Sequence, residues 1–130
     1  MLTDALKFDD KGLIPAIIVD HGTNEVLMLG YMNEEAVRRT VESGLATFWS
    51  RSRQKFWVKG ETSGQTLNVK WLRTDCDCDA LLVGCEPVGP VCHEGYRSCF
   101  FKELAEDEWR AFGEPMIAPE HLYGGNKQQS

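Results

Sequence analysis

Two kinds of metal-binding side chain lie close together between residues 75 and 99 of this sequence. The run Asp75-Cys76-Asp77-Cys78-Asp79 places a carboxylate at every second position, and Cys92, His93 and Cys99 follow within the next twenty residues. Carboxylate oxygens suit hard cations such as Mg²⁺, whereas thiolates and imidazole favour zinc. The segment therefore predicts two different metal ions.

Simpler interpretations of the same residues stay open. Three neighbouring carboxylates repel one another unless a cation lies among them, but an acidic loop can also be solvated without a metal ion. A single cysteine is often only a small buried hydrophobic residue. Cys76 and Cys78 are separated by one residue, where structural zinc sites usually place two to four residues between paired ligands. The spacing therefore does not predict a conventional structural zinc site.

Basic residues are concentrated upstream of the acidic run. The chain has a formal charge of −6, yet residues 51–73 hold six bases and one acid. A local basic patch in an acidic chain predicts a small-anion site such as phosphate rather than a nucleic-acid interface, with a solvated strand face as the alternative. Arg51 and Arg53, with the hydroxyls of Ser50 and Ser52, suit phosphate oxygens. Trp57 could stack on a base or lie in the core.

Length and composition indicate one domain over residues 1–130, with a loosely ordered C-terminal tail from about residue 110. No apolar run approaches the ~18 residues of a membrane helix, and residues 1–10 lack the order of a signal peptide. We therefore expect a cytoplasmic protein without a membrane partner. In that reducing location the five cysteines are more plausible as ligands, nucleophiles or core residues than as disulfides.

The pattern of apolar residues predicts a compact, β-rich α+β subunit with one or two short helices. A hairpin is expected over 14–31, a helix from Glu34 to about Ser43 with Asn33 as its N-cap and Gly44 as its end, and strands near 46–51, 55–59, 66–71, 80–83 and 98–102. Residues 103–109 are expected to form a helical turn or a solvated tail. If Asp75–Asp79 continued the preceding strand, the aspartates would face one side and Cys76 and Cys78 the other.

Four motifs in this order resemble the phosphoribosyl-AMP cyclohydrolase family of histidine biosynthesis. The resemblance covers roughly residues 10–105. It is carried by Phe48-Trp49-Ser50-Arg51-Ser52-Arg53, Trp57-Val58-Lys59-Gly60-Glu61-Thr62-Ser63-Gly64, Asp75-Cys76-Asp77-Cys78-Asp79, and Cys92-His93 with Ser98-Cys99-Phe100.

The resemblance implies a set of ligands and an assembly. One Mg²⁺ per subunit would be bound by Asp75, Asp77 and Asp79, and one Zn²⁺ by Cys76, Cys92 and Cys99. The family shares its zinc site across a homodimer, so the implied fold is an intertwined dimer of the monofunctional form. Cys78 and Cys85 are not implied as ligands. The implied substrate-binding residues are Ser50, Arg51, Ser52, Arg53, Trp57, Lys59, Glu61, Thr62 and Ser63.

The implied reaction is hydrolysis of the N1–C6 bond of the adenine ring in 1-(5-phosphoribosyl)-AMP, which opens it to the phosphoribosyl-formimino imidazole carboxamide ribotide. A zinc-activated water would be the nucleophile, and His93 is the candidate for proton transfer. The substrate is a phosphorylated nucleotide, which agrees with the basic patch. The main alternative is a non-catalytic, zinc-stabilised module that binds a nucleotide or phosphate. A zinc deaminase is disfavoured because its His-x-Glu and Pro-Cys-x-x-Cys motifs are missing.

Overall fold

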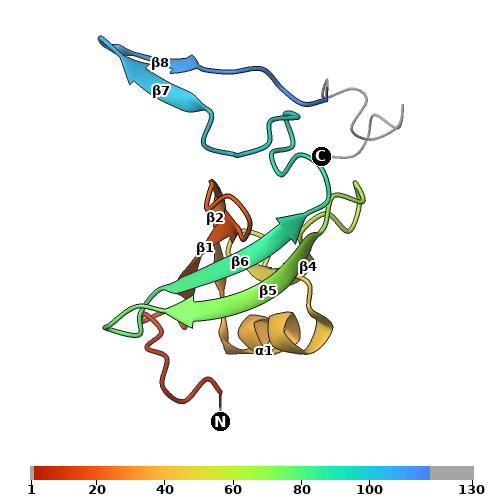
Figure 1. Ribbon diagram of the computed structural model, residues 1–130. Coiled ribbons are helices and arrows are strands. Elements are labelled where there is room, and N and C mark those ends of the chain that lie inside the picture. Colours follow the sequence, from red (N-terminus) through yellow and green to blue (C-terminus); the bar gives the residue numbers. More distant parts are fainter. Residues whose placement is uncertain (1, 118–130) are drawn as a thin grey trace.

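A mixed four-stranded sheet forms the centre of the computed structural model, which describes residues 2–117 (Figure 1). Its strand order is β2-β1-β6-β5, and two further hairpins, β3-β4 and β7-β8, stand outside it. The elements are β1 (Ile14–Asp20), β2 (Val26–Met32), α1 (Glu34–Ser43), β3 (Thr47–Ser50), β4 (Lys55–Val58), β5 (Leu67–Thr74), β6 (Leu81–Pro87), β7 (Lys102–Ala105) and β8 (Glu108–Ala111).

Strand β6 lies between the two parts of the sheet that are far apart in sequence. It pairs parallel with β1 and antiparallel with β5. A parallel pair cannot be closed by a tight turn, so the chain between β1 and β6 must cross over, and α1, β3 and β4 lie in that crossover. The start of β6 follows the turn that connects it to β5, and the end of β6 leads into the loop that carries Cys92 and Cys99.

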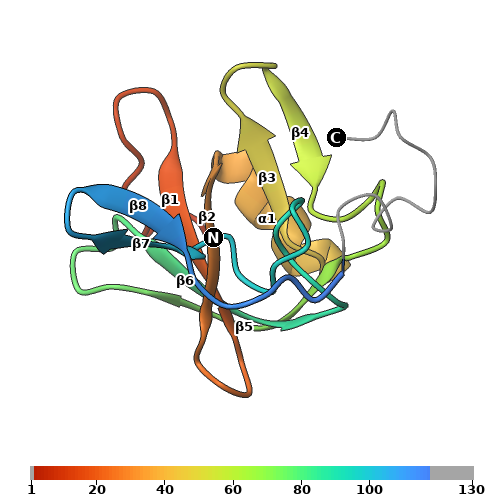
Figure 2. The ribbon, with the colours of Figure 1, turned by 90° about the horizontal axis from the view of Figure 1, so that it is seen from above.

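The predicted helix is confirmed at both ends. The side chain of Asn33 accepts a 2.8 Å hydrogen bond from the backbone N–H of Ala36, and Gly44 ends the helix with a φ of 77°, a conformation that glycine adopts without steric cost. Ala36 and Val37 are buried on one face of α1. These side chains join residues of the sheet in the hydrophobic core, and Figure 2 shows α1 beside β3 when the molecule is seen from above.

The two faces of the sheet differ in burial. Ile14, Ala16 and Ile18 point from β1 into the core that α1 and β3 cover. The alternate residue Ile17 lies opposite Leu29 on one side and Leu82 on the other, and Leu29 is 43% exposed. The second face of the sheet therefore carries an apolar row that the chain leaves partly exposed.

A close contact joins β2 to the β3-β4 hairpin. A Cβ atom added at Gly30 would lie 2.6 Å from a ring atom of Phe48, so only glycine fits there. The Phe48 ring in turn stacks on Trp57 at 4.9 Å between centroids. This packing fixes the hairpin against the sheet and places Trp57 beside the basic residues.

The sequence-based interpretation was wrong for the C-terminal part. Of the strand expected over 98–102, only Lys102 is in a strand. Residues 103–109, expected to be a helical turn or a solvated tail, belong to a largely exposed hairpin. Glu106 takes a φ of 60° at the hairpin turn. Figure 1 shows this hairpin standing away from the sheet. The tail expected from about 110 begins inside β8, and residues 118–130 lie outside the described residues.

Among residues 2–117, no helix is long and apolar enough to cross a membrane.

Candidate metal sites and substrate pocket

The acidic run is a tight turn, not the strand extension that the alternation predicted. The chain must reverse between β5 and β6, and it does so with a backbone hydrogen bond of 3.0 Å from Cys78 N–H to the Asp75 carbonyl. Cys78 takes a φ of 62° within this turn. The Asp75 side chain also accepts a 3.1 Å hydrogen bond from the Asp79 N–H. The prediction of opposite faces for aspartates and cysteines therefore fails.

The turn nevertheless brings the three predicted carboxylates together. Oxygens of Asp75, Asp77 and Asp79 all lie within 4.8 Å of one another, and all three residues are exposed. Loss of hydration raises the pKa of Asp79, and a hydrogen bond with Asp75 and the charges of Asp75 and Asp77 raise it further. Such a cluster of oxygen donors fits a hard divalent cation.

The two downstream cysteines lie on a compact loop between β6 and β7, residues 88–101, which is the cysteine loop. Gly95, with a φ of 91°, lets the loop turn back, and its N–H donates to the Cys92 carbonyl at 2.9 Å. The Cys92 sulfur accepts from the Glu94 N–H at 3.4 Å. The Cys99 N–H donates to the Leu27 carbonyl at 2.7 Å, so the loop is tied to strand β2.

The charge of Lys59 interacts with the side chains of Cys92 and Cys99. Loss of hydration raises the pKa of Cys99 to about 11, the neighbouring Cys92 thiol raises it as well, and the Lys59 ammonium group opposes the shift. Burial lowers the pKa of Lys59, against the effect of Cys99 and Cys92. Two adjacent sulfurs beside a cation fit one part of a thiolate metal site.

Cys76 does not join this pair within one chain. It lies in the turn before β6, whereas Cys92 and Cys99 follow the opposite end of that strand. Seven residues of extended strand span roughly 20 Å. Among residues 2–117, the aspartate triad is the one group of potential ligands close enough to hold an ion without a second chain.

Part of the predicted substrate-binding set lines a cavity of about 670 Å³ beside the β3-β4 hairpin. The predicted residues Ser50, Arg53, Trp57, Glu61 and Thr62 contribute to it. Lys55 and Phe56 also line it and were missed, although the alternation along β4 places Lys55 two residues before Trp57. Arg53 and Lys55 give this cavity two cationic groups for an anionic ligand.

The remaining predicted residues are not among those that line this cavity. Arg51 and Arg53 do not share a strand face, because residues 51–54 form a turn in which Gln54 has a φ of 55°. The Arg51 guanidinium lies 4.2 Å from the centre of the Tyr31 ring. The hydroxyl oxygens of Ser50 and Ser52 lie 3.5 Å apart. The Ser63 hydroxyl accepts a 3.2 Å bond from the Gln65 N–H within the next turn.

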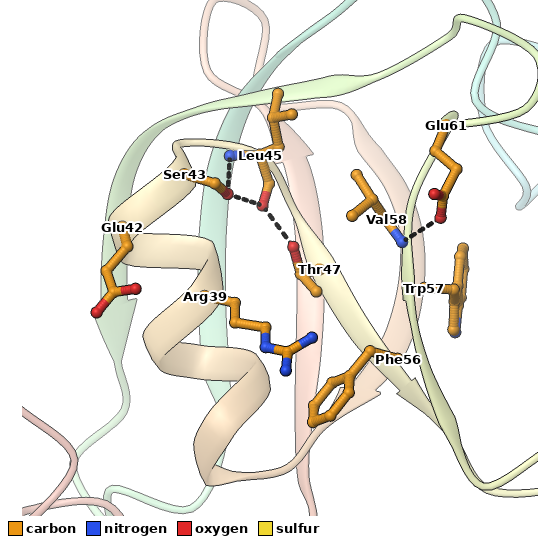
Figure 3. A pocket seen from close by; sticks show the side chains of 9 residues that line it. All are labelled: Arg39, Glu42, Ser43, Leu45, Thr47, Phe56, Trp57, Val58 and Glu61. Atoms are coloured by element: carbon orange, nitrogen blue, oxygen red, sulfur yellow. Dashed lines mark hydrogen bonds between the residues drawn. The ribbon is translucent and has the colours of Figure 1, made fainter.

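A second cavity of about 460 Å³ lies between α1 and the β3-β4 hairpin (Figure 3). Its cation, Arg39, already pairs with Glu35 at 3.3 Å and stacks at 3.9 Å on Phe56. Glu61 accepts a 3.2 Å hydrogen bond from the Val58 N–H. Because Arg39 is engaged locally, this cavity is less suited to a phosphate than the one lined by Arg53 and Lys55.

The other singled-out residues have simple environments. Cys85 is fully buried, and burial raises the pKa of its thiol to about 12, which agrees with a packing role. His93 is exposed on the loop next to the buried Cys92. Its imidazole is therefore open to solvent.

A β-rich subunit that combines a carboxylate cluster, paired thiols and a cationic cavity fits the class of metal-dependent enzymes that act on phosphorylated small molecules. Residues 28–101 match the model of the family described as PRA-CH, phosphoribosyl-AMP cyclohydrolase. The chain is 57% identical over 115 residues to the phosphoribosyl-AMP cyclohydrolase of Solibacter usitatus, an alignment that covers 88% of this chain and 91% of the relative.

Two relatives with lower sequence identity carry the same name. The phosphoribosyl-AMP cyclohydrolase of Methanosarcina barkeri is 52% identical over 120 residues, covering 92% of this chain and 90% of the relative. That of Salinibacter ruber is 48% identical over 122 residues, covering 94% and 96%. The chain belongs to the phosphoribosyl-AMP cyclohydrolase family.

Proposed function

We propose that this protein hydrolyses the N1–C6 bond of the adenine ring of 1-(5-phosphoribosyl)-AMP, a step of histidine biosynthesis. The observation that carries the proposal is the family match over residues 28–101, since this range contains every residue predicted to bind metal or substrate. In the reaction, water adds across the C6–N1 bond with its oxygen on C6 and a proton on N1, and that bond then breaks. It requires a nucleophile at neutral pH and groups that move protons.

The thiols of Cys92 and Cys99 are the part of a zinc site that this chain supplies at one end of β6. Their adjacency, and the Lys59 ammonium group that favours the thiolate form of Cys99, fit a soft divalent metal ion. When bound, zinc provides a water that loses its proton near neutral pH. His93, exposed beside Cys92, is positioned to exchange protons with the solvent during addition and ring opening.

A second copy of the chain would complete the site. Cys76 lies about the length of β6 away from Cys92, so we infer that the partner subunit's Cys76 supplies the third sulfur. The apolar row of Ile17, Leu29 and Leu82 supports a homodimer, because it offers a half-exposed sheet face on which a second sheet can pack. The same assembly would bring the acidic turn of one subunit toward the cysteine loop of the other.

The acidic turn and the cationic cavity have separate roles in this proposal. Asp75, Asp77 and Asp79 would hold Mg²⁺, which prefers a few carboxylates and keeps several waters that can contact phosphate. Arg53 and Lys55 would bind a phosphate of the substrate, and Glu61 and Thr62 in the same cavity offer hydrogen-bond acceptors and a donor. Cysteines that are all free agree with the reducing cytosol that we propose as the location.

The direct test is to incubate the purified protein with 1-(5-phosphoribosyl)-AMP and follow the loss of purine absorbance. We expect turnover that stops when a chelator removes zinc and returns when zinc is restored. If zinc-loaded protein left the purine ring intact while still binding the nucleotide, the non-catalytic zinc module would replace the enzyme.

The cavity assignment has its own test. Arg53→Met should raise KM for the substrate by about 10-fold or more and leave kcat within a factor of a few, because the phosphate is bound but does not react. Arg110→Met is the matched control, since Arg110 forms an exposed ion pair with Glu108 outside the cavity. An unchanged KM in Arg53→Met would move the phosphate site away from this cavity.

A further inference from the structure

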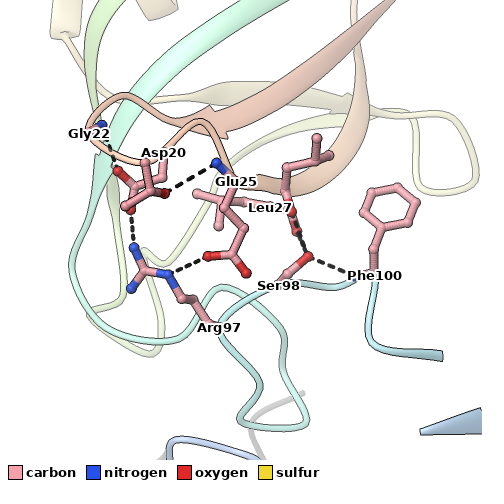
Figure 4. A network of polar contacts seen from close by, with 9 residues as sticks. Asp20, Gly22, Glu25, Leu27, Arg97, Ser98 and Phe100 are labelled. Atoms are coloured by element: carbon pink, nitrogen blue, oxygen red, sulfur yellow. Dashed lines mark hydrogen bonds and ion pairs between the residues drawn. The ribbon is translucent and has the colours of Figure 1, made fainter. Parts of the chain in front are cut away.

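Arg97 connects the cysteine loop to the β1-β2 hairpin. Its Nη2 pairs with a carboxylate oxygen of Asp20, and its Nε pairs with Glu25 at 2.6 Å, so one guanidinium group bridges both ends of the β1-β2 turn (Figure 4). The Asp20 side chain is only 9% exposed. Asp20 also accepts a 2.8 Å hydrogen bond from the Gly22 N–H, which holds its carboxylate in place.

The two residues after Arg97 continue the same attachment. The Ser98 hydroxyl donates to the Val26 carbonyl at 2.7 Å, and the Cys99 N–H donates to the Leu27 carbonyl at 2.7 Å. Three consecutive residues of the loop are therefore fixed to β2 and to the turn before it. On the other side, the Arg97 carbonyl accepts a 3.1 Å bond from the Val91 N–H, which ties it to the residue before Cys92.

The Arg97 ion pairs differ from an ordinary surface ion pair in the segments that they join. Arg38 on α1 also lies between two carboxylates, Glu34 at 3.0 Å and Glu35 at 3.5 Å, and its side chain is 35% exposed against 37% for Arg97. The Arg38 pairs join neighbouring turns of one helix, which backbone hydrogen bonds already fix. The Arg97 pairs join two segments that the sequence separates by more than 70 residues.

We propose that Arg97 is a positioning residue for the zinc site, holding Cys92 and Cys99 at a fixed separation through Asp20 and Glu25. The inference rests on the proposed function for the identity of the metal ion. A loop with two anchored sulfurs binds an ion without first losing conformational freedom, so breaking the anchor weakens retention of the metal ion more than it weakens the fold.

The test compares Arg97→Met with Arg38→Met in the full chain. The readouts are the rate at which zinc passes to a colorimetric chelator, and the rate at which Cys99 of the metal-free protein reacts with a thiol reagent. We expect Arg97→Met to release zinc about 10-fold faster than the wild type and Arg38→Met to release it at the wild-type rate. Arg97→Lys should lie between them, because one ammonium group cannot reproduce the guanidinium fork.

Two further variants separate positioning from folding. Arg97→Met leaves the nearly buried Asp20 carboxylate without its partner, which can destabilise the whole protein. The double variant Asp20→Asn/Arg97→Met removes both charges, and we expect it to regain thermal stability but to keep the fast release of zinc. Glu25→Gln, which removes only the more exposed pair, should accelerate release by a smaller factor.

The outcomes distinguish this inference from the proposed function. Equal zinc release from Arg97→Met and Arg38→Met, or recovery of zinc retention in the double variant, would overturn the positioning role. If the wild-type protein proved to hold no zinc and to leave the purine intact, the proposed function would fail. The change in Cys99 reactivity in Arg97→Met would then still decide whether Arg97 positions the loop.

Discussion

The two ends of strand β6 carry different kinds of predicted metal ligand, and these ligands are brought together in different ways. Before β6, a five-residue turn brings three carboxylates within 4.8 Å of one another. After β6, a loop brings Cys92 and Cys99 together, and the third predicted sulfur, Cys76, remains at the opposite end of the strand. The proposed Mg²⁺ site takes all of its predicted protein ligands from a single chain, whereas the proposed zinc site does not.

The contrast teaches how sequence distance limits a site. Alternate residues of a tight turn converge because the backbone reverses, so a hard-cation site needs only a local signal. A zinc site built from distant segments needs either a fold that brings them together or a second chain. Here the sheet holds the segments apart, since β6 is a rigid spacer between them. In the proposed homodimer, quaternary structure would then be part of the chemistry.

The largest expected effect comes from mixing two inactive variants. Cys76→Ser and Cys99→Ser should each lose zinc and activity, because each removes one sulfur from every site. When the two chains are refolded together, a heterodimer regains one intact site out of two, so random mixing should restore about one quarter of wild-type activity. The measurement is turnover and zinc content of the mixture against each variant alone.

Cys78→Ser serves as the control for this experiment. Cys78 lies in the same turn as Cys76 but is not a predicted ligand, so this variant should keep near-normal zinc content by itself. No recovery of activity in a mixture that demonstrably contains heterodimers would place all three sulfurs in one chain and remove the contrast between the two ends of β6.

Local signals in the sequence were sufficient for much of the fold. Asn33 and Gly44 predicted both ends of α1, and the turn-rich residues 21–24 predicted the β1-β2 hairpin. The β7-β8 hairpin was missed because its strands are short and charged, and its turn uses Glu106 with a positive φ where a glycine or asparagine would have been recognised. The parallel pairing of β1 with β6 has no local signal.

The same distinction applies to the site. Residue type was sufficient to predict the aspartate cluster, although the reason given, an extended strand, was wrong. Spacing alone could not show that Arg51 turns toward Tyr31 while Lys55 lines the cavity, because both depend on how the turn after β3 is formed. The proximity of Lys59 to Cys92 and Cys99 depends on the packing of two loops and was equally inaccessible.

The next largest effect is expected at the aspartate turn before β6. Asp77→Asn removes one of three carboxylates, so the Mg²⁺ concentration needed for half-maximal activity should rise by about 10-fold or more, while zinc content stays unchanged. Asp107→Asn, an exposed acid in the β7-β8 turn, is the matched control. If Asp77→Asn lost zinc as well, the two ends would act as one site.

A smaller effect is expected from Lys59, the cation beside the cysteine loop. The Lys59 ammonium group lowers the pKa of Cys99, so Lys59→Met should move that pKa further above about 11. The thiolate fraction at pH 9 then falls, and alkylation of Cys99 in the metal-free protein should slow by roughly threefold or more. Lys70→Met, which breaks a surface pair with Glu86, should leave the rate unchanged. Faster alkylation in Lys59→Met would contradict the arrangement.

The smallest effect is a pH dependence of the acidic turn without metal. The folded state raises the pKa of Asp79 above its ordinary value of 3.8, so it binds that proton more tightly than the unfolded chain does. The stability of metal-free wild type should therefore fall as pH rises from below 3.8 through the raised pKa, and the loss is complete at neutral pH. Asp79→Asn cannot ionise there, so its Tm should exceed the wild-type Tm at pH 7, and this difference should shrink toward pH 3.

Saturating Mg²⁺ should reverse the order of the two Tm values at pH 7, because the ion stabilises only the wild-type cluster. A difference in Tm that ignores both pH and Mg²⁺ would mean that the turn does not bring its carboxylates into contact, and the acidic end of β6 would then be as incomplete as the cysteine end.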